Sequence, residues 1–328
     1  MQTRIYYNVA VIDAGKEDTL AKNNRQRISP LRFSKITIES LPEISRILHR
    51  YSSSRTCDYT IGGIFMWVDF FDYRFCIYGN TLFICGDLEN RPGVKAFSLP
   101  VGEMPIKNAI NLLREYCSEN GMKLRFSAIP EDRLSDFRCF GLKDTEELTE
   151  WADYLYEAES LARLAGKKLS KKRNHFNRFI TDNPGYSVSD IRDCDREELK
   201  AAYASWTDIS DLTSPSAVEE HNQVYTILEN PDAYPFEGIV LRDGKGRIAA
   251  FTIGELIGDT LYVHIEKIDK ETAGAGETVS KLFADRIVTE HPETIYINRE
   301  EDTGDEGLRQ SKLSYHPVML LRKYNILL

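Results

Sequence analysis

Residues 237–268, EGIVLRDGKGRIAAFTIGELIGDTLYVHIEKI, predict three consecutive antiparallel strands, and this meander decides the fold. Glycine-containing turns at 243–246 and 258–259 separate three apolar runs of strand length. Such short turns can join only antiparallel neighbours, because a parallel connection needs a long crossover. The three predicted strands are 237–243, 247–257 and 260–268.

Helices and strands predicted on either side of the meander complete a recognisable order. One strand and two helices precede it, and a helix, a strand, a helix and a last strand follow it. This is the order of elements in the GNAT acyltransferase fold. The flanking predictions are a strand at 185–192, helices at 195–210 and 214–231, a helix at 276–291, a strand at 294–298, a helix at 305–313 and a strand at 318–327.

The first half of the chain predicts a similar mixture of elements. Helices are expected at 36–51, 60–71, 105–121 and 131–142, and strands at 74–79, 81–87 and 123–130. We therefore predict an α/β (α+β) protein with two tandem GNAT-like domains, each a mixed, mostly antiparallel sheet flanked by helices. The predicted divisions are an N-terminal extension at 1–27, a first domain at 28–150 and a second domain, with the site, at 151–328.

The composition is that of an ordinary globular protein. Among 328 residues, 42 Lys and Arg face 51 Asp and Glu, so the net charge of −9 excludes general coating of nucleic acid and requires a local basic patch for any phosphate contact. The six cysteines lack the close spacing of zinc or redox motifs. No apolar run is long enough for a membrane span, and no secretory signal is seen, so we expect a cytoplasmic protein.

A sharp change of charge marks the start of the second half. Seven acidic and no basic residues lie in 144–162, whereas seven basic and no acidic residues lie in 163–181. Within 169–180 the apolar residues share one helical side and the cations largely occupy the other. This pattern is typical of a phosphate-binding helix, or alternatively of a solvated face paired with the acidic segment. Interleaved His175 and Asn177 favour binding.

The third strand of the meander and the residues after it carry the next group of polar side chains. Alternation places His264 and Glu266 on one face, where they can act as an acid/base pair or anchor a substrate amine, or simply decorate a strand. Gly274 and Gly276 open the following helix, whose free N–H groups can hold a phosphate, although a plain loop is an equal alternative.

A third polar group follows the strand at 294–298. Glu300 and Asp302 come directly after it, and Arg309 and Lys312 lie on the next short helix. Loops at strand ends are where α/β proteins commonly place their sites. The acidic residues lack the alternate spacing of an EF-hand loop, so we predict no metal site.

These stretches carry a resemblance to a known family. AGKKLSKKRNHFNRF, YVHIEKID and NREEDTGDEGLRQSKLSYHP, together with SRTCDYTIGGIFMW in the first half, resemble a bacterial family related to the C-terminal domain of phosphatidylglycerol lysyltransferase. That family is similar in architecture to the Fem peptidoglycan aminoacyltransferases. The resemblance implies transfer of an acyl group, most specifically an aminoacyl group from charged tRNA, to an amine or hydroxyl acceptor such as a small molecule, a peptide or a lipid headgroup.

The resemblance also implies roles for particular residues. A proton acceptor is assigned to Glu266 or Glu300, an amine anchor to Asp302, and an oxyanion donor to Lys312 or Arg309. The residues expected near phosphate are Lys168, Lys171, Lys172, Arg173, His175 and Asn177, and those expected around the reacting ester are His264, Glu266, Glu300, Asp302, Arg309 and Lys312.

Two other functions remain open at this point. An acyl-CoA-dependent N-acetyltransferase is the near alternative, although Glu271 stands where the acyl-CoA loop of GNAT enzymes begins with Arg or Gln. A non-catalytic module that binds nucleic acid or phosphate is the other. Aminoacyl-tRNA and acyl-CoA are thus the expected co-substrates, no firm cofactor is predicted, and the sequence specifies no oligomeric state.

Overall fold

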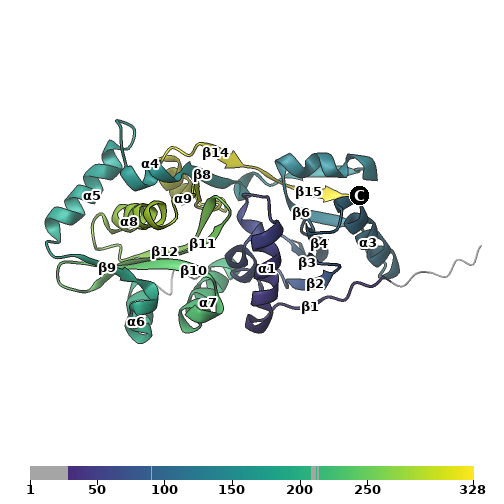
Figure 1. The fold of residues 1–328 in the computed structure, drawn as a ribbon, viewed down its shortest axis with the longest axis horizontal. Helices are drawn as coiled ribbons and strands as arrows, with labels where there is room; N and C mark the ends of the chain where they lie inside the picture. Colours follow the sequence, from purple (N-terminus) through teal and green to yellow (C-terminus); the bar gives the residue numbers. More distant parts are fainter. Residues whose placement is uncertain (1–28, 90, 208–211, 213) are drawn as a thin grey trace, which may run out of the picture.

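The computed structural model describes residues 29–89, 91–207, 212 and 214–328, and forms two lobes that lie side by side, each built on its own sheet (Figure 1). The fold is α+β with two mostly antiparallel sheets flanked by helices, as the sequence predicts. The predicted extension at 1–27 and the last residues of the predicted helix 195–210 lie outside the described residues.

The first lobe contains an eight-stranded sheet with the order β1-β2-β3-β4-β6-β15-β7, in which β5 pairs with β3. All its pairs are antiparallel except β4 with β6. Its strands are β1 (Ser34–Lys35), β2 (Arg74–Tyr78), β3 (Thr81–Leu88), β4 (Arg91–Phe97), β5 (Val101–Gly102), β6 (Arg125–Pro130), β7 (Asp144–Glu147) and β15 (Lys323–Leu327).

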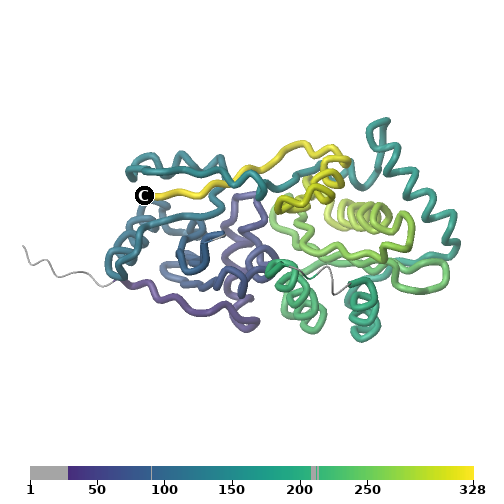
Figure 2. The backbone as a smooth tube through the Cα atoms, turned by 180° about the vertical axis from the view of Figure 1, so that it is seen from behind, coloured from purple at the N-terminus to yellow at the C-terminus, as the bar shows by residue number. Residues whose placement is uncertain are grey.

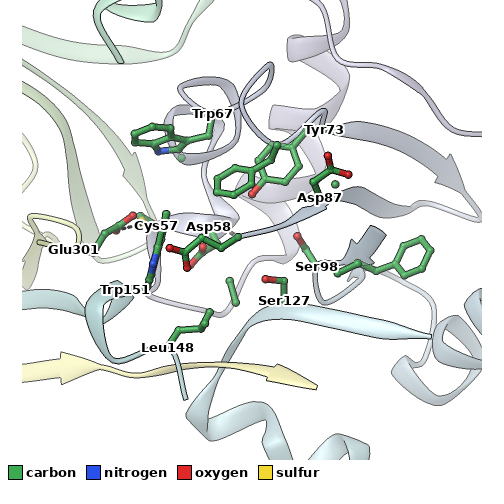
Figure 3. Close-up of a pocket in the computed structure, with 17 residues that line it drawn as sticks. Cys57, Asp58, Trp67, Tyr73, Asp87, Ser98, Ser127, Leu148, Trp151 and Glu301 are labelled. Carbon is green, nitrogen blue, oxygen red and sulfur yellow. Dashed lines mark hydrogen bonds between the residues drawn. The ribbon is translucent and has the colours of Figure 1, made fainter. Parts of the chain in front are cut away.

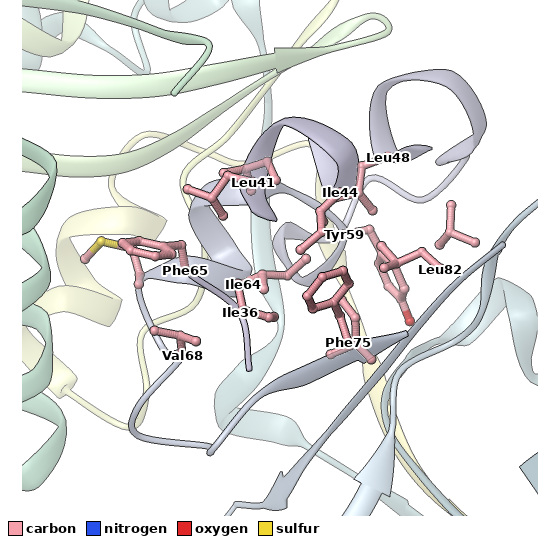
Figure 4. Packing of buried hydrophobic residues seen from close by; sticks show 14 of the residues in the cluster. Ile36, Leu41, Ile44, Leu48, Tyr59, Ile64, Phe65, Val68, Phe75 and Leu82 are labelled. Atoms are coloured by element: carbon pink, nitrogen blue, oxygen red, sulfur yellow. The ribbon is translucent and has the colours of Figure 1, made fainter. Parts of the chain in front are cut away.

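Helices cover this sheet through apolar residues at helical spacing. Leu41, Ile44 and Leu48 of α1 are buried and pack towards Phe75 and Leu82 of the sheet (Figure 4). The lobe contains α1 (Leu41–Tyr51), α2 (Ile61–Phe65), α3 (Ile106–Glu119) and the 3-10 helices η1 (Ile38–Ser40), η2 (Cys57–Tyr59), η3 (Glu131–Phe140) and η4 (Thr149–Trp151).

The second lobe contains a seven-stranded sheet with the order β14-β8-β13-β12-β11-β10-β9. The predicted meander forms its centre, and only the pairing of β12 with β13 is parallel. The strands are β8 (Asp153–Glu157), β9 (Ser187–Asp190), β10 (Phe236–Arg242), β11 (Ile248–Ile257), β12 (Thr260–Ile268), β13 (Tyr296–Asn298) and β14 (Met319–Leu321).

Two helical layers enclose the second sheet, with α8 and α5 on one side and α6 and α7 on the other (Figure 1). The α5 helix lies at the outer end of this lobe beside α8. The helices are α4 (Ala158–Arg163), α5 (Ser170–Asp182), η5 (Ile191–Asp193), α6 (Arg196–Trp206), α7 (Pro215–Glu229), η7 (Pro231–Ala233), α8 (Ala275–Glu290) and α9 (Glu306–Leu313).

The C-terminal segment joins the two lobes and corrects one prediction. The single strand expected at 318–327 is two strands: β14 pairs with β8 in the second sheet, whereas β15 pairs with β6 and β7 in the first. The chain crosses between the lobes at Arg322 (Figure 2). The division proposed at residue 150 falls within η4, between β7 of the first sheet and β8 of the second.

Other elements differ from the predictions for local reasons. The helix expected at 60–71 ends at Phe65 and continues as turns, and the helix expected at 131–142 is the 3-10 helix η3. The sequence analysis does not predict strand β4, because its Pro92 and Gly93 are residues that are unfavourable in the interior of a strand. Strand β8 was not predicted either, because its sequence, DYLYE, continues an acidic run. In the described part of the chain, every helix is too short or too polar to span a membrane.

Candidate active site

A β-bulge at the centre of the second sheet presents His264. The register passes from Ile253 opposite Ile265 to Gly254 opposite Val263, which leaves His264 without a partner on β11. Bulges re-aim side chains and occur often beside active sites. The predicted alternation therefore fails here, and the expected pairing of His264 with Glu266 is not observed: each side chain has a different partner.

His264 lies between two carboxylates. Its Nδ1 is 2.7 Å from Glu300 Oε1, and its Nε2 is 3.5 Å from Glu255 Oε2. Although burial alone would lower it, the neighbouring carboxylates of Glu255 and Glu300 raise the pKa of His264 to about 9. The side chain is therefore an imidazolium at neutral pH, which orients Glu300 and cannot itself accept a proton.

Residues of the first lobe cover His264 and Glu255. Glu255 is fully buried, and it accepts hydrogen bonds from the Gly62 amide at 3.1 Å and from His49 at 3.0 Å. Burial opposes ionisation, but the contacts with His264 and His49 lower the pKa of Glu255 to about 2. A Cβ on Gly62 would lie 2.2 Å from the His264 ring, so only glycine fits there.

Arg299, which the sequence analysis did not select, connects the predicted residues. Its Nη2 donates to Glu266 Oε1 at 2.8 Å, and its guanidinium lies 4.8 Å from the ring centre of Tyr315. The ammonium of Lys172 lies 4.2 Å from the same ring centre. The other terminal nitrogen of Arg299, Nη1, is buried and has no hydrogen-bond partner. The site thus contains an unused donor beside Glu266.

Lys312 holds the loop that carries Glu300. Its ammonium donates to the carbonyl of Arg299 at 2.6 Å and to that of Glu301. Glu300 has a φ of +57°, a conformation that is costly for a residue with a Cβ, and its amide donates to Asn298 Oδ1 at 2.7 Å. Burial lowers the pKa of Lys312. Its contacts indicate a positioning role rather than the oxyanion contact expected from the sequence.

Asp302 and Arg309 form a pair beside this loop. Arg309 donates to both oxygens of Asp302, at 2.7 and 3.0 Å, while Tyr154 and the Gly304 amide donate to the same carboxylate at 2.5 and 2.9 Å. Burial acts to raise the pKa of Asp302, but Arg309 and Tyr154 lower it. Four donors occupy the carboxylate, so these contacts fix the start of α9 and leave no free place for an incoming amine.

The residues predicted to bind phosphate divide into two groups on α5 and just before it. Lys168, Lys171 and Asn177 are exposed. The others contact this protein: Lys172 and His175, which is itself exposed, lie 3.3 and 3.2 Å from Glu277, and Arg173 donates to the carbonyls of Leu164 and Gly166 at 2.5 and 3.2 Å. Only Lys168, Lys171 and Asn177 are free to meet a ligand without losing such a contact.

The two glycines before and within α8 serve packing. Gly274 has a φ of +80°, and a Cβ on it would lie 2.5 Å from the His175 carbonyl oxygen of α5. Gly276 has room for a Cβ at 3.6 Å from Ile268. Glu277, in the first turn of α8, already supplies the negative charge that a helix N-terminus favours. A phosphate at this turn therefore stays a prediction.

A second buried group of charges lies where the lobes meet, and no local pattern predicts it because its members are scattered along the sequence. Lys323 of β15 is fully buried, with Nζ 2.6 Å from Asp153, 2.8 Å from Asp58 and 3.6 Å from Glu301. Cys57 Sγ lies 3.4 Å from the same ammonium. Ligand atoms of Cys57, Asp153 and Glu301 lie within 4.8 Å of one another, as in a metal site, but the ammonium of Lys323 is the cation that they surround.

Burial dominates the electrostatics of this junction cluster, which we define as Cys57, Asp58, Asp153, Glu301 and Lys323. It raises the pKa of Glu301 to about 8 although Lys323 acts against it, because Asp153 and Glu300 add negative charge. The same burial raises the pKa values of Asp58 and of Cys57. The junction cluster therefore carries more acid than its single ammonium can neutralise.

Comparison with known proteins places these residues in a family context. A family model described as "Phosphatidylglycerol lysyltransferase, C-terminal" matches residues 49–327. A conserved protein of unknown function from Bacteroides thetaiotaomicron is 30% identical and superposes with a TM-score of 0.80, covering 91% of this chain and 99% of that one. An uncharacterised protein of Mycoplasmoides gallisepticum is 25% identical over 182 residues, 52% of this chain and 54% of that protein, so the chain spans about half the length of this curated relative.

Two further structures share the fold at low identity. L-PGS from Bacillus licheniformis is 16% identical with a TM-score of 0.58, covering 87% of this chain and 91% of that one. FemX is 10% identical with a TM-score of 0.57, covering 90% of this chain and 97% of that one. These likenesses concern the fold, and they confirm the predicted similarity to the lysyltransferase domain and to Fem-type architecture.

Proposed function

Because the chain belongs to the family of the phosphatidylglycerol lysyltransferase C-terminal domain, we propose that it is an acyltransferase acting on an amine or hydroxyl acceptor. The donor that we propose is an aminoacyl-tRNA. The acceptor is a small molecule, a peptide or a lipid headgroup, met in the cytoplasm. We also propose that the chain is organised as two tandem GNAT-like domains, with the reaction in the second.

The observation that carries this proposal is a continuous series of contacts from the exposed face of α5 to the carboxylates. Lys168 and Lys171 are exposed beside Lys172, which lies over Tyr315. Tyr315 also contacts Arg299, which pairs with Glu266. A polyanion held by the exposed lysines would therefore place its reacting end near Arg299 and Glu266.

The side chains at the end of this series have the chemistry that acyl transfer needs. Glu266 and Glu300 are partly open to solvent, with 20% and 22% of their side chains exposed, so an acceptor can reach them. Arg299 has a buried Nη1 without a hydrogen-bond partner, and its guanidinium is suited to stabilise the oxyanion that forms on the ester once it turns towards the bound donor. His264 stays protonated and orients Glu300.

The proposed step is aminolysis of an ester. The amine lone pair attacks the carbonyl carbon, so that a C–N bond forms and the C–O bond to the ribose breaks. Glu300 or Glu266 accepts the proton that the nitrogen loses, and the ribose oxygen finally receives it. The products are an amide and a free 3′ hydroxyl. With a hydroxyl acceptor, the same proton transfer yields a new ester.

Equilibrium binding to charged and uncharged bulk tRNA at two salt concentrations tests the donor. We expect salt-sensitive binding, and the Lys168→Ala/Lys171→Ala variant should weaken it about 10-fold and lower the salt slope by between one and two. This pair is preferable to a variant of Lys172, whose loss would also break contacts with Glu277 and Tyr315. The matched control is Lys107→Ala/Lys123→Ala, which removes two exposed lysines from the first lobe.

Three outcomes separate the candidate functions. Equal losses in both double variants would show that net charge alone drives binding and would contradict a tRNA site on α5. Stabilisation by CoA without tRNA binding would favour an N-acetyltransferase instead. If Glu300→Gln keeps tRNA affinity and abolishes aminoacyl transfer, the protein is an enzyme, whereas binding without transfer in the unmodified protein would leave only a binding module.

A further inference from the structure

A pocket in the first lobe has walls of a different kind from the candidate active site. Its empty space is about 630 Å³, a volume that includes the open mouth. Figure 3 shows Trp67 and Tyr73 on one side, Leu148 and Ser127 on the other, and Asp58 between them. The lining of the pocket therefore combines aromatic rings with carboxyl groups.

The aromatic walls form a connected set. Phe71 contacts Tyr73 with ring centres 5.3 Å apart, and it contacts Trp151 edge-on at 6.1 Å. Trp67 completes the lining. Aromatic faces attract cations through their quadrupole, most strongly when the site is partly removed from water. Walls of this kind favour an organic cation over an anion or a sugar.

The acidic part of the lining has more carboxyl groups than cations, so a second cation in the pocket would favour the ionised form of Glu301, which is otherwise largely protonated at neutral pH. Asp58 and Glu301 reach the pocket from the junction cluster, where three carboxylates surround the single ammonium of Lys323. Glu301 is 8% exposed, and Cys57 donates to its Oε2 at 3.2 Å. No described residue donates to its second oxygen. A nine-tenths-buried carboxylate in the wall thus retains an unused acceptor.

We propose that this pocket binds the tip of a primary alkylammonium, with its charge met by Asp58 and Glu301 and its carbon atoms held against Trp67, Phe71 and Trp151. The ligand class is a free small amine or the amine end of a larger molecule, such as a lysine side chain in a peptide. The inference goes beyond the proposed function, because it requires binding alone and does not depend on acyl transfer.

Titration with ethylammonium chloride, followed by tryptophan fluorescence, tests this inference. The chain contains three tryptophans. The Trp206→Phe variant keeps only Trp67 and Trp151, which both line the pocket, so the tryptophan signal reports on the pocket. We expect a saturable signal with ethylammonium and none with ethanol or with sodium chloride at equal ionic strength. An equal response to ethanol would show a merely apolar pocket, and an equal response to sodium chloride would show an effect of ionic strength; either would overturn the proposal.

Variants of the lining locate the binding. Glu301→Gln should weaken ethylammonium binding about 10-fold, and Trp151→Leu several-fold, whereas Ser118→Ala, on the exposed face of α3 and outside the pocket, should leave it unchanged. Glu301→Gln also changes the buried junction cluster, so a loss of binding in that variant can come from altered folding. Trp151→Leu changes a half-buried residue outside the cluster and therefore tests the binding independently. Unchanged affinity in both would place the amine elsewhere and refute the assignment. Tighter binding of Nα-acetyl-lysine methylamide than of ethylammonium would identify a peptide source, and the reverse order a free amine.

Discussion

The cations of α5 and the cation of the junction cluster differ in how the protein uses them. Lys168 and Lys171 lie three positions apart in the sequence and are exposed to water. Lys323 is fully buried, and its partners Asp58, Asp153 and Glu301 come from three distant segments. An exposed charge costs little and is available to a ligand, whereas a buried charge must be paired inside the fold. A local cluster of charged residues in a sequence therefore indicates an exposed binding surface. It does not predict which charged residues are buried and paired inside the fold.

The candidate active site lies between these extremes. Lys172, Arg299 and Glu266 are only 12–20% exposed, and each has an internal partner. Such groups are held in place and can still meet a ligand. The three regions thus form a series from free charge, through positioned charge, to fully buried charge, and substitutions in each should affect different properties.

Removal of the buried ammonium should have the largest effect. Lys323→Met leaves three carboxylates without their cation, so we expect the free energy of unfolding to fall by about 3–5 kcal/mol, as is typical when one partner of a buried ion pair is lost. Urea unfolding of the variant measures this change. The matched control is Lys95→Met, a half-buried lysine that pairs with Asp72 and Asp87, which should cost about 1 kcal/mol or less. Similar losses in both would contradict the distinction between buried and surface pairs.

A change of pH should have the next largest effect on the free energy of unfolding. The folded pKa of His264 is raised to about 9 from 6.5, so its stabilisation is complete below pH 6.5 and is lost as pH rises through 9. The folded pKa of Glu301 is raised to about 8 from 4.5, so its contribution is complete below pH 4.5 and is lost as pH rises from 4.5 to 8. Glu255, with its pKa lowered to about 2, acts oppositely and loses its stabilisation as pH falls below 4.5.

These three shifts place the maximum of stability near pH 4.5, where the stabilisation by Glu255 is complete and the ionisation of Glu301 has not yet begun to lower stability. We expect a decrease on the order of a few kcal/mol from pH 6 to pH 9, measured by urea unfolding at each pH. His264→Gln should be less stable at pH 6 and show a shallower decrease towards pH 9. A variant with the same slope as the unmodified protein would mean that His264 is not an imidazolium in the folded state.

Removal of the exposed cations should have the smallest effect on stability. Lys168→Ala/Lys171→Ala should change the free energy of unfolding by less than about 0.5 kcal/mol, because neither side chain has an internal ion pair among the described contacts. Thermal melts at equal ionic strength measure this. A loss of several kcal/mol would show that α5 is structural and would remove the basis for proposing it as a phosphate-binding surface.

The part of the site that could be predicted came from local pattern. Residues 264–266 are predicted from alternation along a strand and residues 298–312 from their place after one, and the structure brings them into one connected group through Arg299 and Lys312. Their pairing was not predictable. The bulge at His264 depends on register with β11, and Glu300 turns towards His264 only because Lys312 holds the adjacent carbonyls.

The sequence by itself determined the meander, most helices, the basic surface of α5 and the resemblance to a family, because each depends on residues close together in the chain. Tertiary structure decided the rest. Arg322 divides the last apolar run between two sheets, Gly62 of one lobe is fitted to His264 of the other, and Lys323 gathers carboxylates from distant segments. Most of the contacts behind these features join residues more than 90 positions apart, and no local pattern of charge or hydrophobicity encodes which distant partner a residue will meet.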